Sequence, residues 1–115
     1  MPIIETLENA VSQDLQTHYY KASYDQIKEV YLETLKRLGH DIVSVNDDYA
    51  EIFSELPHFS VNAKIIMQTP KETSIDFYID SEFLFGNKAK AINFMKEVYK
   101  DIEKKYEFKG VSLHR

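Results

Sequence analysis

The stretch SVNAKIIMQTPKETSIDFYID, residues 60–80, decides the fold because apolar and polar residues alternate along both of its arms. An alternation with a period of two is typical of a β-strand that buries one face. The apolar rows of the two arms are Val61, Ala63, Ile65 and Met67, and Ile75, Phe77 and Ile79. We expect the arms to form a hairpin with Ile65 opposite Phe77 and Met67 opposite Ile75, and with residues 70–72 as its turn.

Two further strands are predicted upstream, in DIVSVN (residues 41–46) and YAEIFSEL (residues 49–56). Two aspartates, a residue type that tolerates tight turns, stand between them at 47–48. A two-residue turn at this point pairs Val43 with Ile52, and all four strands then share one apolar face.

The turn in the next stretch, PHFS at residues 57–60, is expected to pair Leu56 with Val61 and to bring Ile52 beside Ile65. A fifth strand is predicted over about residues 15–22. VSLHR at 111–115 is expected to form a short terminal strand.

Two helices complete the pattern. In SYDQIKEVYLETLKRLG, residues 23–39, Ser23 and Gln26 have the spacing of a capping box, and Gly39 suits a left-handed C-terminal cap. A second helix is predicted from about Lys88 to Tyr106, where apolar residues recur at three- and four-residue steps. Its apolar stripe comprises Ala91, Ile92, Met95, Val98, Tyr99, Ile102 and Tyr106.

The predicted order of elements is β-α-β-β-β-β-α, within one domain spanning residues 1–115. We therefore predict a two-layer α+β fold, with an antiparallel sheet of four to five strands and both helices packed on one face.

This order resembles the TATA-binding-protein-like fold. The stretches YYKASYDQIKEVYLETLKRLG and LFGNKAKAINFMKEVYKDIEKKYEFKGVSLH also resemble a family of small uncharacterised cytosolic proteins of low-GC Gram-positive bacteria. The resemblance covers nearly the whole chain and implies a fold rather than a catalytic signature, because that family is classed as a domain of unknown function.

Composition narrows the possible functions. The formal net charge of −5 disfavours a nucleic-acid partner, because phosphate contacts need clustered cations. The chain has no cysteine, which removes thiolate nucleophiles and cysteine-ligated metals. The beginning of the chain does not read as a signal peptide, and no apolar run approaches the roughly 18 residues of a membrane span. We therefore expect a cytoplasmic protein with no membrane partner.

The predicted register places a set of large side chains on the face without helices. The candidate partner-binding residues are Ile42, Phe53, Lys64, Ile66 and Tyr78. An apolar patch rimmed by charges is typical of a protein-binding surface. Two other interpretations stay open: the N-terminal segment with Ile3, Ile4 and Leu7 could cover this face, or these residues are the scattered exposed apolar groups of any monomer.

Catalytic and ligand-binding signals are weak. Asn87, Lys88 and Lys90 at the second helix start could bind an anion, although phosphate loops carry more glycine than the single Gly86 found here. Glu51 and Asp76 could approach each other across Ile66, but a catalytic pair needs one raised pKa. The four histidines have no metal-ligand spacing. We therefore assign no catalytic residue, metal or cofactor.

The leading hypothesis is a non-enzymatic protein-binding or adaptor domain that uses the open sheet face. The alternative is a small-ligand-binding domain with a pocket between the sheet and the C-terminal helix, lined by Phe77, Met95, Tyr99 and Tyr106. The same face could bind a second copy of the chain.

Overall fold

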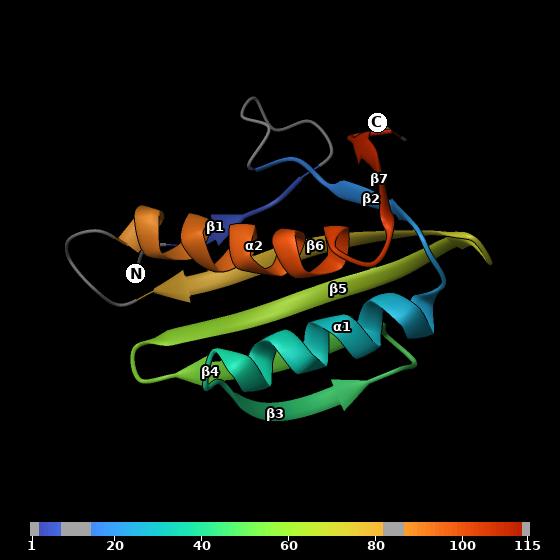
Figure 1. The fold of residues 1–115 in the computed structure, drawn as a ribbon. Coiled ribbons are helices and arrows are strands. Elements are labelled where there is room, and N and C mark those ends of the chain that lie inside the picture. The colour runs from blue at the N-terminus through green and yellow to red at the C-terminus, as the bar shows by residue number, and fades with distance from the viewer. Residues whose placement is uncertain (1–2, 8–14, 82–86, 114–115) are drawn as a thin grey trace.

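A seven-stranded antiparallel sheet carries two helices in the computed structural model, which describes residues 3–7, 15–81 and 87–113 (Figure 1). The elements are β1 (Ile3–Glu5), β2 (His18–Lys21), α1 (Tyr24–Arg37), β3 (Asp41–Asn46), β4 (Glu51–Leu56), β5 (Phe59–Thr69), β6 (Glu72–Ser81), α2 (Asn87–Glu103) and β7 (Glu107–Val111). The strand order is β3-β4-β5-β6-β2-β7, and β1 also pairs with β6. The α+β class is thus as predicted.

The sheet has more strands than the four to five predicted. β1 is a three-residue strand, too short to show an alternation in the sequence. β1 and β2 pair with successive parts of the same edge of β6: Glu5 lies opposite Tyr78, and His18 opposite Ile75. The terminal strand β7 begins at Glu107, four residues before the predicted stretch, and pairs with β2.

The two helices lie side by side on one face of the sheet (Figure 1). At the start of α1 both bonds of the predicted capping box are formed, from the Gln26 backbone N–H to Ser23 Oγ and from the Ser23 backbone N–H to Gln26 Oε1. Gly39 takes a φ of 78° just after the helix, as a left-handed cap requires. The helix α2 ends at Glu103 rather than at Tyr106, because the chain turns there to enter β7.

Apart from Ile42 and Val43, side chains along the meander face the predicted sides, but the strand register differs from the prediction by two residues in all three hairpins. The observed pairs are Val45 with Ile52, Ile52 with Ala63, Ala63 with Phe77, and Met67 with Thr73. The predicted pairs were Val43 with Ile52, Ile52 with Ile65, Ile65 with Phe77, and Met67 with Ile75. A shift of two keeps every side chain on its face, because the side-chain period of a strand is also two.

The lengths of the turns account for these shifts. The first turn covers the four residues 47–50, and Ala50 within it has a φ of 56°. The second has only two residues, with His58 at a φ of 62°, so that Leu56 pairs with Phe59 rather than Val61. The third has two residues and a register irregularity between Met67 and Thr69. Alanine rarely adopts a positive φ, and histidine does so in only a minority of cases, so neither residue type predicts one from the sequence.

Ile42 is a specific correction to the predicted surface. A register irregularity between Ile42 and Ser44 turns Ile42 to the side of its partner Ser54, which is 1% exposed, and Ile42 packs against the core. Val43, predicted on the core face, is 60% exposed instead. The cause is a β-bulge, which adds one residue to an edge strand and reverses the facing beyond it.

The core between sheet and helices is aromatic at its centre. The Phe77 ring lies 5.9 Å from the ring centroids of Tyr31 and Tyr99 and 5.8 Å from that of Phe94. Phe77, Met95 and Tyr99 are buried in this packing. The position predicted for a ligand pocket is therefore occupied by side chains in mutual contact.

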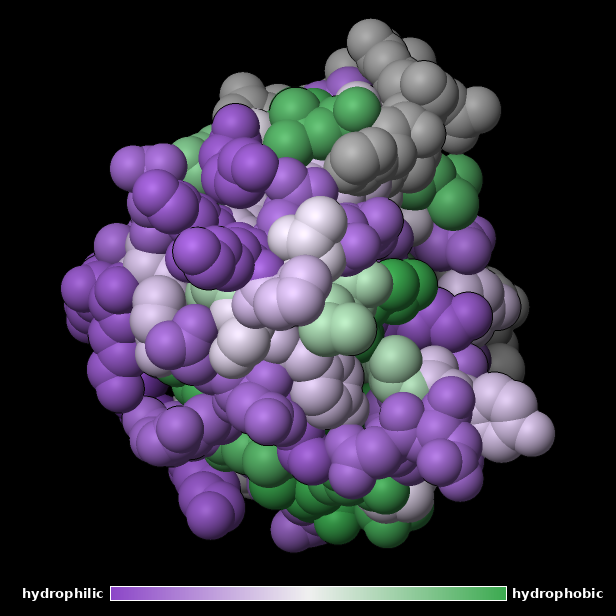
Figure 2. Space-filling model, turned by 90° about the vertical axis from the view of Figure 1, so that its right-hand side faces the viewer, coloured by the Kyte–Doolittle hydropathy of each residue, from purple (hydrophilic) through white to green (hydrophobic). Residues whose placement is uncertain are grey.

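The molecular surface is mostly hydrophilic in the view from the right-hand side of Figure 1 (Figure 2). Apolar side chains gather at the bottom of this view, at the β3 edge of the sheet, where Val43 and Val45 are exposed. Within the described residues, no helix is long and apolar enough to cross a membrane.

Candidate functional site

Two rows of outward-facing side chains cross the open face of the sheet. The first row pairs Phe53 with Asn62, Asn62 with Tyr78, and Tyr78 with Glu5. The second pairs Glu51 with Lys64 and Lys64 with Asp76. Lys64, not Ile66, thus stands between Glu51 and Asp76, as a consequence of the two-residue shifts.

Four of the five predicted partner-binding residues lie on this face. Phe53, Ile66 and Tyr78 are 42%, 40% and 43% exposed, and the Lys64 side chain is 52% exposed. Ile42 is the exception, because it faces the helices. The face therefore presents large apolar groups that the described helices leave uncovered.

A recess of about 290 Å³ lies on this face, between β4, β5, β6 and the end of β1. Its lining residues are Glu5, Thr6, Leu7, Glu51, Asn62, Lys64, Asp76, Phe77 and Tyr78. The described part of the N-terminal segment forms one wall of the recess: it extends the sheet along β6, with Ile4 packed on the core and Leu7 exposed. Residues 3–7 therefore do not cover the open face.

Asp76 occupies the part of β6 between its pairing with β1 and its pairing with β2. Thr6 Oγ1 donates a hydrogen bond to Asp76 Oδ1 at 2.6 Å, and Thr17 Oγ1 donates to the same atom at 2.7 Å. Thr6 is itself held by Phe77, whose backbone N–H donates to Thr6 Oγ1 at 2.8 Å and whose carbonyl accepts from the Thr6 N–H. The end of β1 and the start of β2 thus both fix this carboxyl group.

Burial raises the pKa of Asp76 above its ordinary value, and the hydrogen bonds from Thr6 and Thr17 only partly offset this effect. The negative charge of Glu5 acts in the same direction as burial, and Lys64 acts against it. Lys64 Nζ lies 3.7 Å from Glu51 Oε1, its ion-pair partner in the row. The recess therefore holds one partly buried carboxyl whose charge is poorly compensated.

Asn62 is another polar residue of the recess lining. Its Oδ1 atom is buried and accepts no hydrogen bond from any residue that the structure describes. A buried carbonyl oxygen without a donor is unusual in a folded protein and costs stability. The strand register places this amide between Phe53 and Tyr78.

The structure describes only one side chain of the predicted anion site, that of Lys90. The side chains of Asn87 and Lys88 lie outside the described part of the chain. Lys90 places its ammonium 5.0 Å from the centroid of the Phe59 ring. It also lines a smaller recess of about 220 Å³ with His40, whose pKa burial lowers. Among the described residues, no three His, Cys, Asp or Glu side chains are grouped to hold a metal ion.

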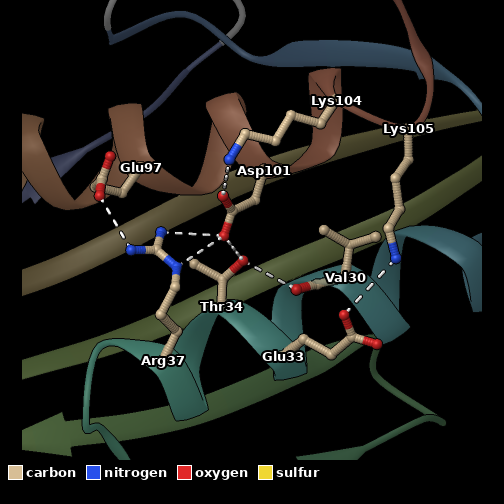
Figure 3. Close-up of polar contacts among 8 residues, drawn as sticks. All are labelled: Val30, Glu33, Thr34, Arg37, Glu97, Asp101, Lys104 and Lys105. Carbon is tan, nitrogen blue, oxygen red and sulfur yellow. Dashed lines mark hydrogen bonds and ion pairs between the residues drawn. The ribbon is translucent and has the colours of Figure 1, made fainter.

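A second polar cluster joins the helices, on the other side of the sheet (Figure 3). The Arg37 guanidinium donates to Asp101 Oδ2 from Nη2 at 3.0 Å and to Glu97 Oε1 from Nη1 at 3.2 Å. Thr34 Oγ1 donates to the same Asp101 oxygen at 2.7 Å, and Lys104 Nζ lies 3.7 Å from Oδ1. Because its charges are paired within the chain, we interpret this cluster as a clamp between α1 and α2.

Sequence reasoning identified the exposed face but missed the recess. Glu5, Thr6 and Thr17 lie far from Asp76 in the sequence and reach it only through the pairing of β1 and β2 with β6. The strand alternation of residues 60–67 predicts that Asn62 is a polar residue facing outward. It does not predict that the Asn62 side-chain oxygen lacks a hydrogen-bond donor.

Comparison with known proteins adds no relative: no protein-family model, no curated protein and no solved structure matches the chain.

Proposed function

We propose that this protein is a non-enzymatic binding domain that docks a partner protein on the open face of its sheet. The observation that carries the proposal is the exposure of Phe53, Ile66 and Tyr78 on one face, beside a charged recess. Binding surfaces combine exposed aromatic and apolar groups with a polar rim, and aromatic residues contribute much of the binding free energy.

The backbone under these side chains supports the proposal. Phe53, Ile66 and Tyr78 come from β4, β5 and β6, the central strands of the sheet. A rigid sheet holds such groups in place before a partner arrives, which lowers the entropy lost on binding.

We also propose that the chain is a cytoplasmic bacterial protein with a TATA-binding-protein-like arrangement. The support is the order of its elements and the resemblance of residues 19–39 and 84–114 described above.

Two other functions have less support. A ligand pocket beside α2 would need space where Phe77 and Tyr99 are in ring contact at 5.9 Å. Acid–base catalysis by the predicted pair of Glu51 and Asp76 has less support, because Glu51 is paired with Lys64, which stands between the two acids.

The proposal can be tested by affinity capture from native lysate with tagged wild-type protein and two double variants. Phe53→Asp with Tyr78→Asp alters the open face. Val45→Asp with Tyr49→Asp is the matched control, because both residues are exposed at the β3 edge and its turn, and Val45 pairs with Ile52 on the helix side of the sheet. We expect the wild type and the control to retain the same protein and the face variant to lose it.

The retained protein is then purified and its affinity measured for each folded variant. The face variant should bind at least about tenfold more weakly than the control, as for loss of an interface hot spot. Equal affinities for all three versions, or capture of nothing by the wild type, would contradict docking on this face. Light scattering on the wild type shows whether the partner is a second copy.

A further inference from the structure

The recess on the open face is rich in hydrogen-bond acceptors and poor in positive charge. Three carboxyl groups line it, from Glu5, Glu51 and Asp76, against the single cation Lys64. Lys64 already forms an ion pair with Glu51, with Lys64 Nζ 3.7 Å from Glu51 Oε1. A ligand group that complements this lining carries a positive charge and several donors.

The carboxyl group of Asp76 has unused acceptor capacity in the recess. Both threonine hydroxyls donate to Oδ1, and no described residue donates to Oδ2. Asn62 and Tyr78 lie across from each other on the paired strands β5 and β6, next to the pair of Lys64 and Asp76. A planar group with several N–H donors can bond to the Asp76 carboxylate while it lies against Tyr78.

The aromatic side chains indicate which cation fits best. Phe53 and Tyr78 flank Asn62 in one row, on the two strands beside it. A guanidinium group stacks on aromatic rings and also presents five donors in a fixed plane, whereas an ammonium is a more strongly hydrated point charge. An arginine side chain therefore matches both the rings and the acceptors.

We propose that the recess binds the guanidinium group of an arginine side chain carried by the docked partner. This inference rests on the proposed function and specifies the chemistry of the partner: a positively charged segment that presents arginine to the open face. The formal net charge of −5 on the whole chain favours the approach of such a segment.

The test replaces the unidentified partner with a small molecule that carries the arginine side chain. The full-length protein, labelled with ¹⁵N, is titrated with N-acetylargininamide, and the amide signals of recess residues are followed by NMR. N-acetylcitrullinamide is the matched control probe, because it has nearly the same shape without the charge. We expect saturable shifts for Asn62, Lys64 and Tyr78 with roughly millimolar affinity, as for a single small group, and none with the citrulline probe.

Two charge variants are expected to change the affinity for the arginine probe in opposite directions. Asp76→Asn should weaken binding of the arginine probe about fivefold, the effect of one charge at a partly exposed site. Lys64→Gln should strengthen it, because it removes the cation that competes for the same acceptors. Glu55→Gln is the control, since Glu55 is exposed on the same face but does not line the recess.

Equal binding of both probes, no shift in the recess residues, or no change with Asp76→Asn and Lys64→Gln would overturn the arginine proposal. The docking surface would still stand if the Phe53 and Tyr78 variant loses a partner that the β3-edge variant retains. If that comparison fails while the arginine probe binds, the recess binds small cations independently of any protein partner.

Discussion

Asp76 and Asp101 are held alike but differ in charge compensation. Each accepts a hydrogen bond from a threonine hydroxyl at 2.7 Å, Asp76 from Thr17 and Asp101 from Thr34. Burial tends to raise the pKa of both. At Asp101 the bonds from Thr34 and Arg37 outweigh burial and lower the pKa, whereas at Asp76 burial prevails.

The difference separates a structural site from the proposed binding site. Asp101 has its countercharge from Arg37 within the chain, so its ionised form stabilises the contact between α1 and α2. Burial disfavours the charge of Asp76 and raises its pKa. No cation among the described residues is dedicated to it, since Lys64 is paired with Glu51. Proteins commonly keep such destabilising groups where they bind a ligand.

The largest expected effect comes from removing a hydroxyl that supports Asp76. Thr17→Val keeps the buried shape but removes one of two donors to the carboxylate, and should lower the free energy of unfolding at pH 7 by about 1–2 kcal/mol. Thr34→Val should cost less, because Arg37 still binds Asp101. Urea denaturation of both variants measures the two losses.

The loss in Thr17→Val should also shrink at low pH, where Asp76 is protonated and needs the donor less. An equal or greater loss in the free energy of unfolding for Thr34→Val would contradict the inference that the charge of Asp101 is better compensated than that of Asp76.

The second prediction concerns the two aspartates themselves, which should respond to neutralisation with opposite signs. Asp101→Asn should destabilise the protein by about 1 kcal/mol at pH 7, a value reduced for the exposure of Arg37. The lowered pKa of Asp101 means that this contribution is present at neutral pH and is lost as pH falls through the pKa of the folded state.

Asp76→Asn should instead raise the melting temperature slightly at pH 7. Because the pKa of Asp76 is raised in the folded protein, folding is favoured when Asp76 is protonated. This stabilisation is lost as pH rises through the pKa of the folded state. The gain from Asp76→Asn should therefore vanish below the ordinary pKa of 3.8. Melting curves of both variants from pH 3 to pH 7 test this prediction. Destabilisation by Asp76→Asn at pH 7 would contradict the inference that the charge of Asp76 is poorly compensated.

The smallest effect is expected at the outer end of the helix clamp. Lys105 Nζ lies 3.7 Å from Glu33 Oε2, and both side chains are more than half exposed. Lys105→Gln should change the free energy of unfolding by less than about 0.5 kcal/mol, because water screens exposed ion pairs. A loss in urea denaturation as large as that of Asp101→Asn would mean that the clamp acts as one cooperative network.

Local signals in the sequence were sufficient for the helices and for the facing of most strand residues. The capping box of Ser23 and Gln26 and the cap at Gly39 occur as predicted, because each depends on residues within a few positions. The alternation along 60–80 placed Phe77 in the core and Tyr78 outside, as the structure has them.

The register and the recess required the tertiary structure. A shift of two residues leaves the alternation unchanged, so no pattern of apolar residues could distinguish Ala63 from Ile65 as the partner of Phe77. In the first two hairpins the turns set the register through positive φ values at Ala50 and His58. In the third, a two-residue turn and the irregularity between Met67 and Thr69 set it.

Patterns within the chain were thus sufficient to predict the α+β class, both helices and most of an exposed face with Phe53 and Tyr78 on it. The folded structure was needed to show that Ile42 faces inward and that Thr6 and Thr17 meet at Asp76, 70 and 59 residues away along the chain. The two kinds of feature differ in how far apart along the chain the interacting residues are. Caps and alternation depend on neighbours in the chain, whereas a binding recess depends on which distant strands share an edge of the sheet.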